Sequence, residues 1–228
     1  MPKQTKFVDD FKNALKDDEI KDLIYELFVR PVVQAYENSI EELRQKVASL
    51  ENANDNLEQQ GRKDSIRIKN VPEEELEEKS TDDFVIDFAK EHLDLDLTPH
   101  DISVSHKLSK EPNDHGKFNL IVKFSRRNVK RDVYSRKKKL KNSGYVITED
   151  LTFKRRAIMA RLGNLRWKKK IFSCWSMDGK IFYKAANDKA KGKYIDTDKI
   201  KVFWDSDKKD YTFVTSDITL DFLKHVPS

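Results

Sequence analysis

Hydrophobic positions in the first 62 residues recur with helical periods. Phe7 and Phe11 lie four residues apart, and the apolar side chains between residues 20 and 28 recur at steps of three and four. This spacing predicts one or two short amphipathic helices within residues 1–30. Over residues 31–62 the hydrophobic positions recur at alternating steps of three and four residues through four consecutive heptads, and charged residues flank them. This pattern predicts a left-handed coiled coil. The expected oligomerisation seam is Val33, Tyr36, Ile40, Leu43, Val47, Leu50, Asn54 and Leu57.

The heptads leave the number of strands in this coiled coil open. β-branched residues at the first seam position, leucines at the second and a seam asparagine, Asn54, favour a parallel dimer. The segment from Lys46 to Glu51 resembles a trimer-specifying pattern of short coiled coils, with lysine in place of the usual arginine. Lysine lacks the guanidinium fork, so that resemblance is partial.

The hydrophobic period changes from helical to alternating at residue 63. Alternation predicts strands over Ser65–Pro72, Ile102–Leu108, Lys117–Phe124 and Tyr145–Thr148. A capping sequence at Ser80 opens a first helix, and Ser125 begins a second that runs to about Leu140. The order β-α-β-β-α-β predicts a ferredoxin-like domain over residues 63–148.

Two of these strands compare with those that carry stacking rings in RNA-recognition motifs. Arg67 stands in the first strand where an aromatic residue is usual, and the third strand offers Asn119 and Ile121. We therefore expect a non-standard RNA-recognition domain that contacts phosphates more than bases. A guanidinium can stack on a base, so Arg67 is a candidate contact.

Residues 149–205 predict a small α+β domain. A basic helix starts near Thr152, and a hairpin turn at Ser176–Gly179 joins two strands. Phe172, Phe182 and Phe203 are expected in the core, while residues 206–228 are expected to form a tail, either a short helix or a disordered end. The predicted fold class is thus α+β, with N-terminal helices and a parallel coiled coil preceding two small domains.

Charge is distributed unevenly along the chain. Residues 125–170 hold 17 Lys and Arg against three acids, a net charge of +14, so the remainder of the chain sums to −9. Such asymmetry indicates a polyanionic partner. The residues expected to contact nucleic acid are Arg67, Lys69, Arg126, Arg127, Lys130, Arg131, Arg136, Lys137, Lys138, Lys154, Arg155, Arg156, Arg161, Trp167 and Lys168.

Other classes of protein find little support in the sequence. No apolar run reaches the 18 residues of a membrane span, the N-terminus is polar, and Cys174 is the single cysteine. The five histidines are scattered, and no nucleotide-binding, hydrolase or zinc-protease motif occurs. We expect a non-enzyme without metal or cofactor, located in a cytoplasmic ribonucleoprotein, with entry to the nucleus left open.

The order of these motifs resembles the first-open-reading-frame proteins of LINE-type retrotransposons. The resemblance rests on the heptads and on Ser65–Glu73, His106–Leu108, Lys117–Phe124, Arg136–Lys139 and Ile147–Thr152. Residues 148–203 are similar to the C-terminal domain of the baculovirus few-polyhedra protein. The resemblance implies a homotrimer that coats single-stranded RNA and acts as a nucleic-acid chaperone. It also implies RNA contacts at Lys107, Lys117, Lys123 and Arg136.

The leading expectation is therefore an oligomeric, largely sequence-independent protein that binds single-stranded RNA, or DNA, as part of a non-LTR retrotransposon. The alternative is a coiled-coil adaptor for protein partners, or a viral structural regulator of few-polyhedra type. A third hypothesis attaches the basic helices to a membrane surface.

Overall fold

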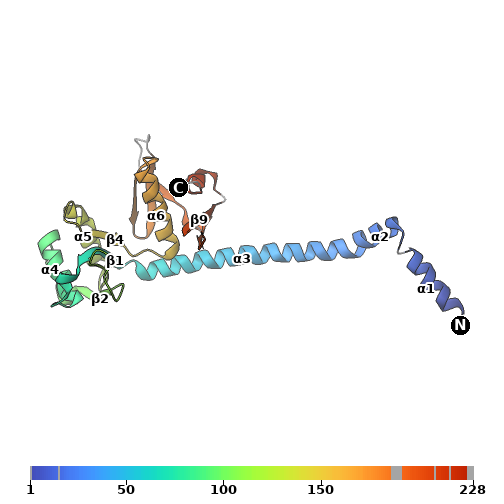
Figure 1. Cartoon of the computed structure of the whole chain (residues 1–228), viewed down its shortest axis with the longest axis horizontal. Helices are drawn as coiled ribbons and strands as arrows, with labels where there is room; N and C mark the ends of the chain where they lie inside the picture. Colours follow the sequence, from blue (N-terminus) through green and yellow to red (C-terminus); the bar gives the residue numbers. More distant parts are fainter. Residues whose placement is uncertain (1, 15, 186–191, 208, 216, 225–228) are drawn as a thin grey trace. The chain divides into compact units, whose positions relative to one another are not determined.

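A computed structural model describes residues 2–14, 16–185, 192–207, 209–215 and 217–224 (Figure 1). The chain has the predicted α+β class, with one long helix and antiparallel sheets. It divides into two compact units, residues 1–53 and 54–228, so the long helix contributes residues to both.

The first unit is helical. It holds α1 (Pro2–Ala14), α2 (Asp18–Ile24) and most of α3 (Arg30–Arg62), with one π-helical turn over Tyr25–Val29 joining α2 to α3. Asp17 caps α2 by accepting a hydrogen bond from the Glu19 backbone N–H at 3.0 Å. Short helices therefore precede a long one, as the hydrophobic periods predict.

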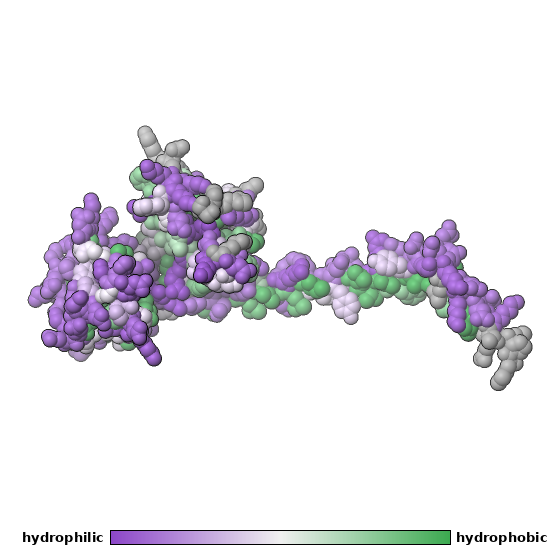
Figure 2. Space-filling view, in the orientation of Figure 1, coloured by the Kyte–Doolittle hydropathy of each residue, from purple (hydrophilic) through white to green (hydrophobic). Residues whose placement is uncertain are grey.

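All eight positions of the predicted seam are exposed on α3. Leu50 and Leu57 are each 68% exposed, and Figure 2 shows hydrophobic side chains gathered along one face of this helix. A contiguous apolar stripe of this kind is rare on a protein surface without a partner.

The second unit begins with a four-stranded antiparallel sheet in the order β2-β3-β1-β4. Its core contains Ile66 and Ile68 of β1 and Leu120 and Val122 of β3. These residues belong to one buried cluster with helix residues such as Phe88. The strands are β1 (Ser65–Pro72), β2 (Ile102–Lys107), β3 (Lys117–Phe124) and β4 (Val146–Glu149). The helices are α4 (Thr81–Leu93) and α5 (Arg127–Ser135), with 3-10 turns at Glu73–Leu76, Pro99–Asp101 and Arg136–Leu140.

In this region the sequence pattern predicts the bounds of the strands and the start of the first helix closely. β1 and β3 have the predicted bounds, and Ser80 caps α4 by accepting a hydrogen bond from the Asp83 N–H. The second helix differs from the prediction, because it begins at Arg127 and ends at Ser135, after which the chain tightens into a 3-10 turn. The Ser125 N–H instead bonds the Asp101 carbonyl, which holds that residue outside the helix.

The rest of the second unit contains one helix and two small sheets. Thr152 caps α6 (Phe153–Trp167), as the predicted helix start suggested. One sheet orders β5 (Ile171–Met177), β6 (Lys180–Ala185) and β7 (Lys193–Ile195), and the other pairs β8 (Ile200–Asp205) with β9 (Asp210–Thr215). The predicted hairpin turn holds Asp178 at φ 52° and Gly179 at φ 78°. Two further 3-10 turns cover Thr197–Lys199 and Ile218–Leu223.

The structure corrects the expectation of a separate tail after residue 205. Phe213 of β9 and the turn residues Leu220 and Leu223 are buried in a core shared with Ile158 and Leu162 of α6. This segment belongs to the fold because β9 pairs along its whole length with β8, the strand just before it. Residues 225–228 lie outside the described chain.

None of the helices in the described ranges is both long and apolar enough to cross a membrane.

Candidate nucleic-acid interface

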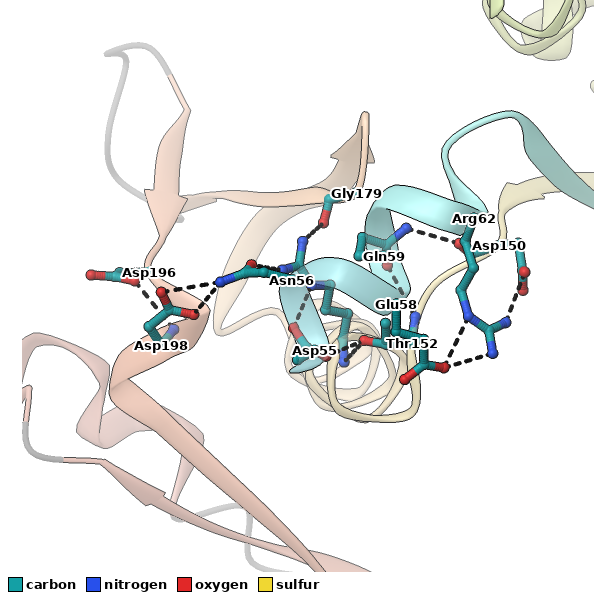
Figure 3. A network of polar contacts seen from close by, with 11 residues as sticks. Asp55, Asn56, Glu58, Gln59, Arg62, Asp150, Thr152, Gly179, Asp196 and Asp198 are labelled. Carbon is teal, nitrogen blue, oxygen red and sulfur yellow. Dashed lines mark hydrogen bonds and ion pairs between the residues drawn. The ribbon is translucent and has the colours of Figure 1, made fainter. Parts of the chain in front are cut away.

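The last turns of α3 fix the segment that links the two halves of the second unit. Gln59, 2% exposed, donates from Nε2 to the Asp150 carbonyl and accepts the Thr152 N–H at Oε1, both at 3.0 Å (Figure 3). One amide side chain thereby pairs with the extended backbone between β4 and α6. This pairing ties the end of α3 to the segment that leads from the four-stranded sheet into α6.

A second set of buried contacts joins α3 to α6. Asp55 accepts hydrogen bonds from Thr152 Oγ1 at 2.5 Å and from Arg155 Nε at 2.9 Å. Arg155 also donates to the Gly179 carbonyl at 3.0 Å and to Asn56 Oδ1 at 2.6 Å, and Asn56 in turn donates to Asp198 (Figure 3). All three nitrogens of the Arg155 guanidinium therefore donate within the fold, so this arginine has a structural role.

Asp150 neutralises two arginines at once. Its side chain is 2% exposed and accepts from Arg62 Nη1 at 2.8 Å and from Arg67 Nε at 2.7 Å. Arg67 projects from the sheet face opposite the core, next to Ile121 of β3 and Thr148 of β4. The guanidinium that we expected to stack on a base is thus paired with a carboxylate.

A cleft of about 810 Å³ opens beside Arg67, between β1, β4 and the turn after α5 on one side and α6, β5 and β9 on the other. Tyr134 and Ser176 both line this cleft, and the Tyr134 hydroxyl donates to the Ser176 carbonyl at 3.1 Å. Burial raises the pKa of Tyr134 to about 12. The cations in its walls are Arg67, Lys69, Lys137, Arg156 and Arg166, and the aromatic residues are Tyr134, Phe153, Trp175 and Tyr211.

Among the described residues that line the cleft, Glu149 alone is acidic. Its carboxylate is already satisfied, because Lys130 Nζ lies 2.6 Å away and the N–H groups of Asp178 and Gly179 donate to it at 2.8 and 3.2 Å. The cleft therefore presents an excess of positive charge.

Burial lowers the pKa values of three of the lining cations, and neighbouring cations lower them further. Desolvation lowers the pKa of Lys69 below its ordinary value, and the nearby guanidinium groups of Arg67 and Arg156 lower it further. The pKa of Arg156 is lowered by desolvation and then by Arg67. Desolvation also lowers the pKa of Lys137, whose ammonium lies 3.6 Å from the centre of the Tyr134 ring. Each of these groups would be stabilised by an anion.

Three residues predicted to face nucleic acid are instead buried, which corrects that expectation. Lys130 pairs with Glu149, Arg155 with Asp55, and Arg161 donates to the Tyr211 carbonyl at 2.6 Å. Each side chain is under a tenth exposed. Their partners lie between 19 and 100 residues away along the chain, so helical periodicity could not reveal them.

Other predicted contacts have structural partners at the surface. Arg136 donates to the Leu93 carbonyl at 3.0 Å and to the Asp94 carbonyl, so it closes the C-terminal end of α4, where cations stabilise the exposed carbonyls. Arg126 and Arg127 form ion pairs with Asp101 at 2.7 Å and with Asp64 at 3.0 Å. Lys107 lies 4.1 Å from the centre of the Phe118 ring.

The remaining predicted cations lie at the surface or at the cleft. Lys69, Lys123, Arg131, Lys138 and Arg156 are exposed, and within the described chain none forms a hydrogen bond or ion pair through its side chain. Lys117 and Lys154 are half-buried, Lys168 is exposed, and Trp167 is 88% exposed at the end of α6. The structure thus brings Arg67, Lys69, Lys137 and Arg156 together at the cleft and leaves the others apart.

Of the aromatic residues that line the cleft, the sequence suggested Trp175 as a ring that could stack on a base, but not Tyr134, Phe153 or Tyr211. Tyr211 belongs to the segment predicted to be a tail, and alternation in β9 was the signal that could have placed it. The expected core position of two rings is also wrong, because Phe172 and Phe203 are 66% and 54% exposed. Phe182 is half-buried, with its ring stacked on that of Trp175.

No protein-family model matches this chain, and no curated protein matches it in a sequence comparison.

Proposed function

We propose that this protein binds single-stranded RNA or DNA, largely independently of sequence, and that it acts as an oligomeric nucleic-acid chaperone or ribonucleoprotein coat. The observation that carries the proposal is the cleft of the second unit, which is lined by five cations and by one carboxylate that is already paired. Of these cations, Arg67 is paired with Asp150, which does not line the cleft. Phosphates supply the charge that such a surface lacks. The rings of Phe153 and Tyr211 favour a strand whose bases are free to stack.

The connectivity of the four-stranded sheet supports this assignment. Its β-α-β-β-α-β order and its strand order β2-β3-β1-β4 are those of ferredoxin-like domains, the plan on which RNA-recognition motifs are built. On the open face, Arg67, Asn119 and Ile121 occupy positions where rings would stack. Contacts to the phosphate backbone rather than readout of bases follow from this composition.

Oligomerisation through α3 would multiply these contacts. The exposed heptad stripe fits a parallel coiled coil, with a homotrimer as the state implied by the family resemblance and a dimer as its alternative. A second and third binding unit on one strand act at high effective concentration, so modest single sites give tight binding overall. The resemblance to first-open-reading-frame proteins of LINE-type retrotransposons points to the same activity.

A salt titration tests the proposal. Binding of a fluorescent oligo(U) strand of about 30 nucleotides, long enough for several sites, is measured by anisotropy from low to high salt, with the equivalent DNA strand and a duplex as comparisons. We expect log affinity to fall with log salt at a slope of about −0.7 per phosphate contacted. A flat salt dependence, or no binding at low ionic strength, would refute the electrostatic mechanism.

A further inference from the structure

We propose that Lys69 and Arg156 form a pocket for one phosphate ester inside the cleft, occupied by an interior phosphodiester of the bound strand. This inference rests on the proposed function and assigns the tightest phosphate contact of that site. The two side chains come from opposite walls, Lys69 from β1 and Arg156 from the first turn of α6.

Backbone contacts fix the spacing of these two walls. Lys69 pairs with Val146 in the β1–β4 ladder, and β4 leads through Asp150 and Leu151 directly into α6. That connection is held by Gln59 through its two hydrogen bonds. Both cations line the same cleft, and Arg156 is near enough to lower the pKa of Lys69. Because backbone contacts position their elements before an anion arrives, the entropic cost of binding an anion there is reduced.

The charges around the pocket are out of balance. Asp150 is the acid that acts on Arg156, and it already serves both Arg62 and Arg67. Arg67 in turn repels both Lys69 and Arg156. One phosphodiester carries a single negative charge and offers two unesterified oxygens, so it can accept from the guanidinium and the ammonium at once.

The neighbouring rings identify the anion as part of a nucleotide. Phe153 lies one helical turn or less from Arg156, and its ring meets that of Tyr211 edge to face with 5.6 Å between the ring centres. Both rings line the cleft, and Phe153 is 47% exposed. A base attached to the bound phosphate can stack there, whereas a bare inorganic anion would leave these rings unused.

The test compares two double variants of the full-length chain that remove the same charge. The pocket variant is Lys69→Gln with Arg156→Gln. The control is Lys90→Gln with Lys110→Gln, two exposed lysines on α4 and on the loop before β3. Neither pair has hydrogen-bonded side chains in the described structure, so both variants should keep the thermal unfolding midpoint of the parent.

Anisotropy with the oligo(U) strand gives the first readout. The pocket variant is expected to bind at least about tenfold more weakly at low salt and to reduce the salt slope by about 0.7, the value for one lost phosphate contact. The control should stay within about twofold of the parent, because neither lysine lines the cleft and exposed charges are screened. Equal affinities for the two variants would overturn the pocket while leaving the proposed function intact, whereas a parent chain that does not bind at all would refute the proposed function itself.

Lysine side-chain NMR gives the second readout and separates the sources of the phosphate. The pKa of Lys69 should rise when the oligo(U) strand is added, while that of Lys90 stays unchanged. The same titration with uridine monophosphate and with inorganic phosphate shows whether a free phosphate suffices. A rise with the strand alone supports the interior phosphodiester, and an equal rise with either free phosphate overturns that assignment. No rise with any of the three overturns the pocket altogether.

Discussion

Asp55, near the end of α3, forms a buried ion pair with Arg155 in the first turn of α6, with 2.9 Å between Oδ2 and Nε. Each side chain is 8% exposed, and the two residues lie 100 positions apart, with the whole four-stranded sheet between them in sequence. Because the pair joins the helix to the module that follows the sheet, the last turns of α3 are part of the folded second unit rather than a linker.

Removal of one partner from this pair should destabilise the second unit strongly. Asp55→Ala leaves the Arg155 guanidinium buried without its carboxylate, and the expected loss in free energy of unfolding is about 3–5 kcal/mol. Urea unfolding followed by circular dichroism measures this loss.

The double variant Asp55→Leu with Arg155→Met provides the matched control. It removes both charges together, so we expect it to be more stable than Asp55→Ala alone. If the single variant and the double variant were equally unstable, the pairing would have no special role.

The hairpin turn between β5 and β6 should be intolerant of a side chain at Gly179. An alanine there would adopt φ of about 78° and would place its Cβ 2.5 Å from Gln59 Cγ, displacing the amide that fixes the β4–α6 connection. The left-handed backbone alone costs about 1–2 kcal/mol. Differential scanning calorimetry should show Gly179→Ala unfolding at a lower temperature than the parent.

Gly116→Ala separates backbone strain from the clash. Gly116 has φ of 66°, but no heavy atom lies within 4 Å of the position that an alanine Cβ would take, so this variant carries the conformational penalty alone. A drop in midpoint for Gly116→Ala as large as that of Gly179→Ala would contradict the proposed contact with Gln59.

The stability of the 3-10 turn that leads into β2 should depend on pH through Asp101. Its side chain accepts hydrogen bonds from Arg126 Nη2 and from the side chain and backbone N–H of Thr98, which hold its pKa at about 2. A carboxylate with a lowered pKa stabilises the fold above its ordinary pKa near 4, and that contribution is lost as the pH falls towards 2.

Asp101→Asn should therefore be less stable than the parent at pH 7, by about 1 kcal/mol because the arginine is exposed and the ion pair is screened. The difference should shrink as the pH falls from 4 to 2, where the parent carboxylate becomes protonated. Urea midpoints measured at several pH values test this. A gap that stays constant across that range would show that the charge of Asp101 contributes nothing.

A charge in the heptad stripe should separate assembly from folding. The proposed assembly through α3 predicts that Leu43→Asp, which places a carboxylate in the exposed stripe, gives a monomer by light scattering, whereas the parent gives an oligomer. The second unit should keep its fold, and affinity for oligo(U) should fall by about 10²-fold or more as the linked sites are lost. Glu42→Asp, at an exposed position beside the stripe, should leave both mass and affinity unchanged.

Much of the local structure could be predicted from residues that are neighbours in sequence. Alternation set the bounds of β1 and β3, the hydroxyl of Ser80 marked the start of α4, and Asp178 with Gly179 marked a hairpin. Each of these features depends on backbone preferences over a few residues, and those preferences can be read directly from the amino acids.

The site could be predicted only in part. Local sequence was enough to show that positive charge is concentrated in residues 125–170 and that Arg67 and Lys69 alternate with core positions on β1. The packing of the folded chain decides which of these cations remain available to contact a nucleic acid. Lys130, Arg155 and Arg161 pair with acceptors 19 to 100 positions away along the chain, whereas Lys69 and Arg156 line one cleft. The partner of a charged side chain is chosen by the packing of distant elements, and periodicity along one helix contains no information about it.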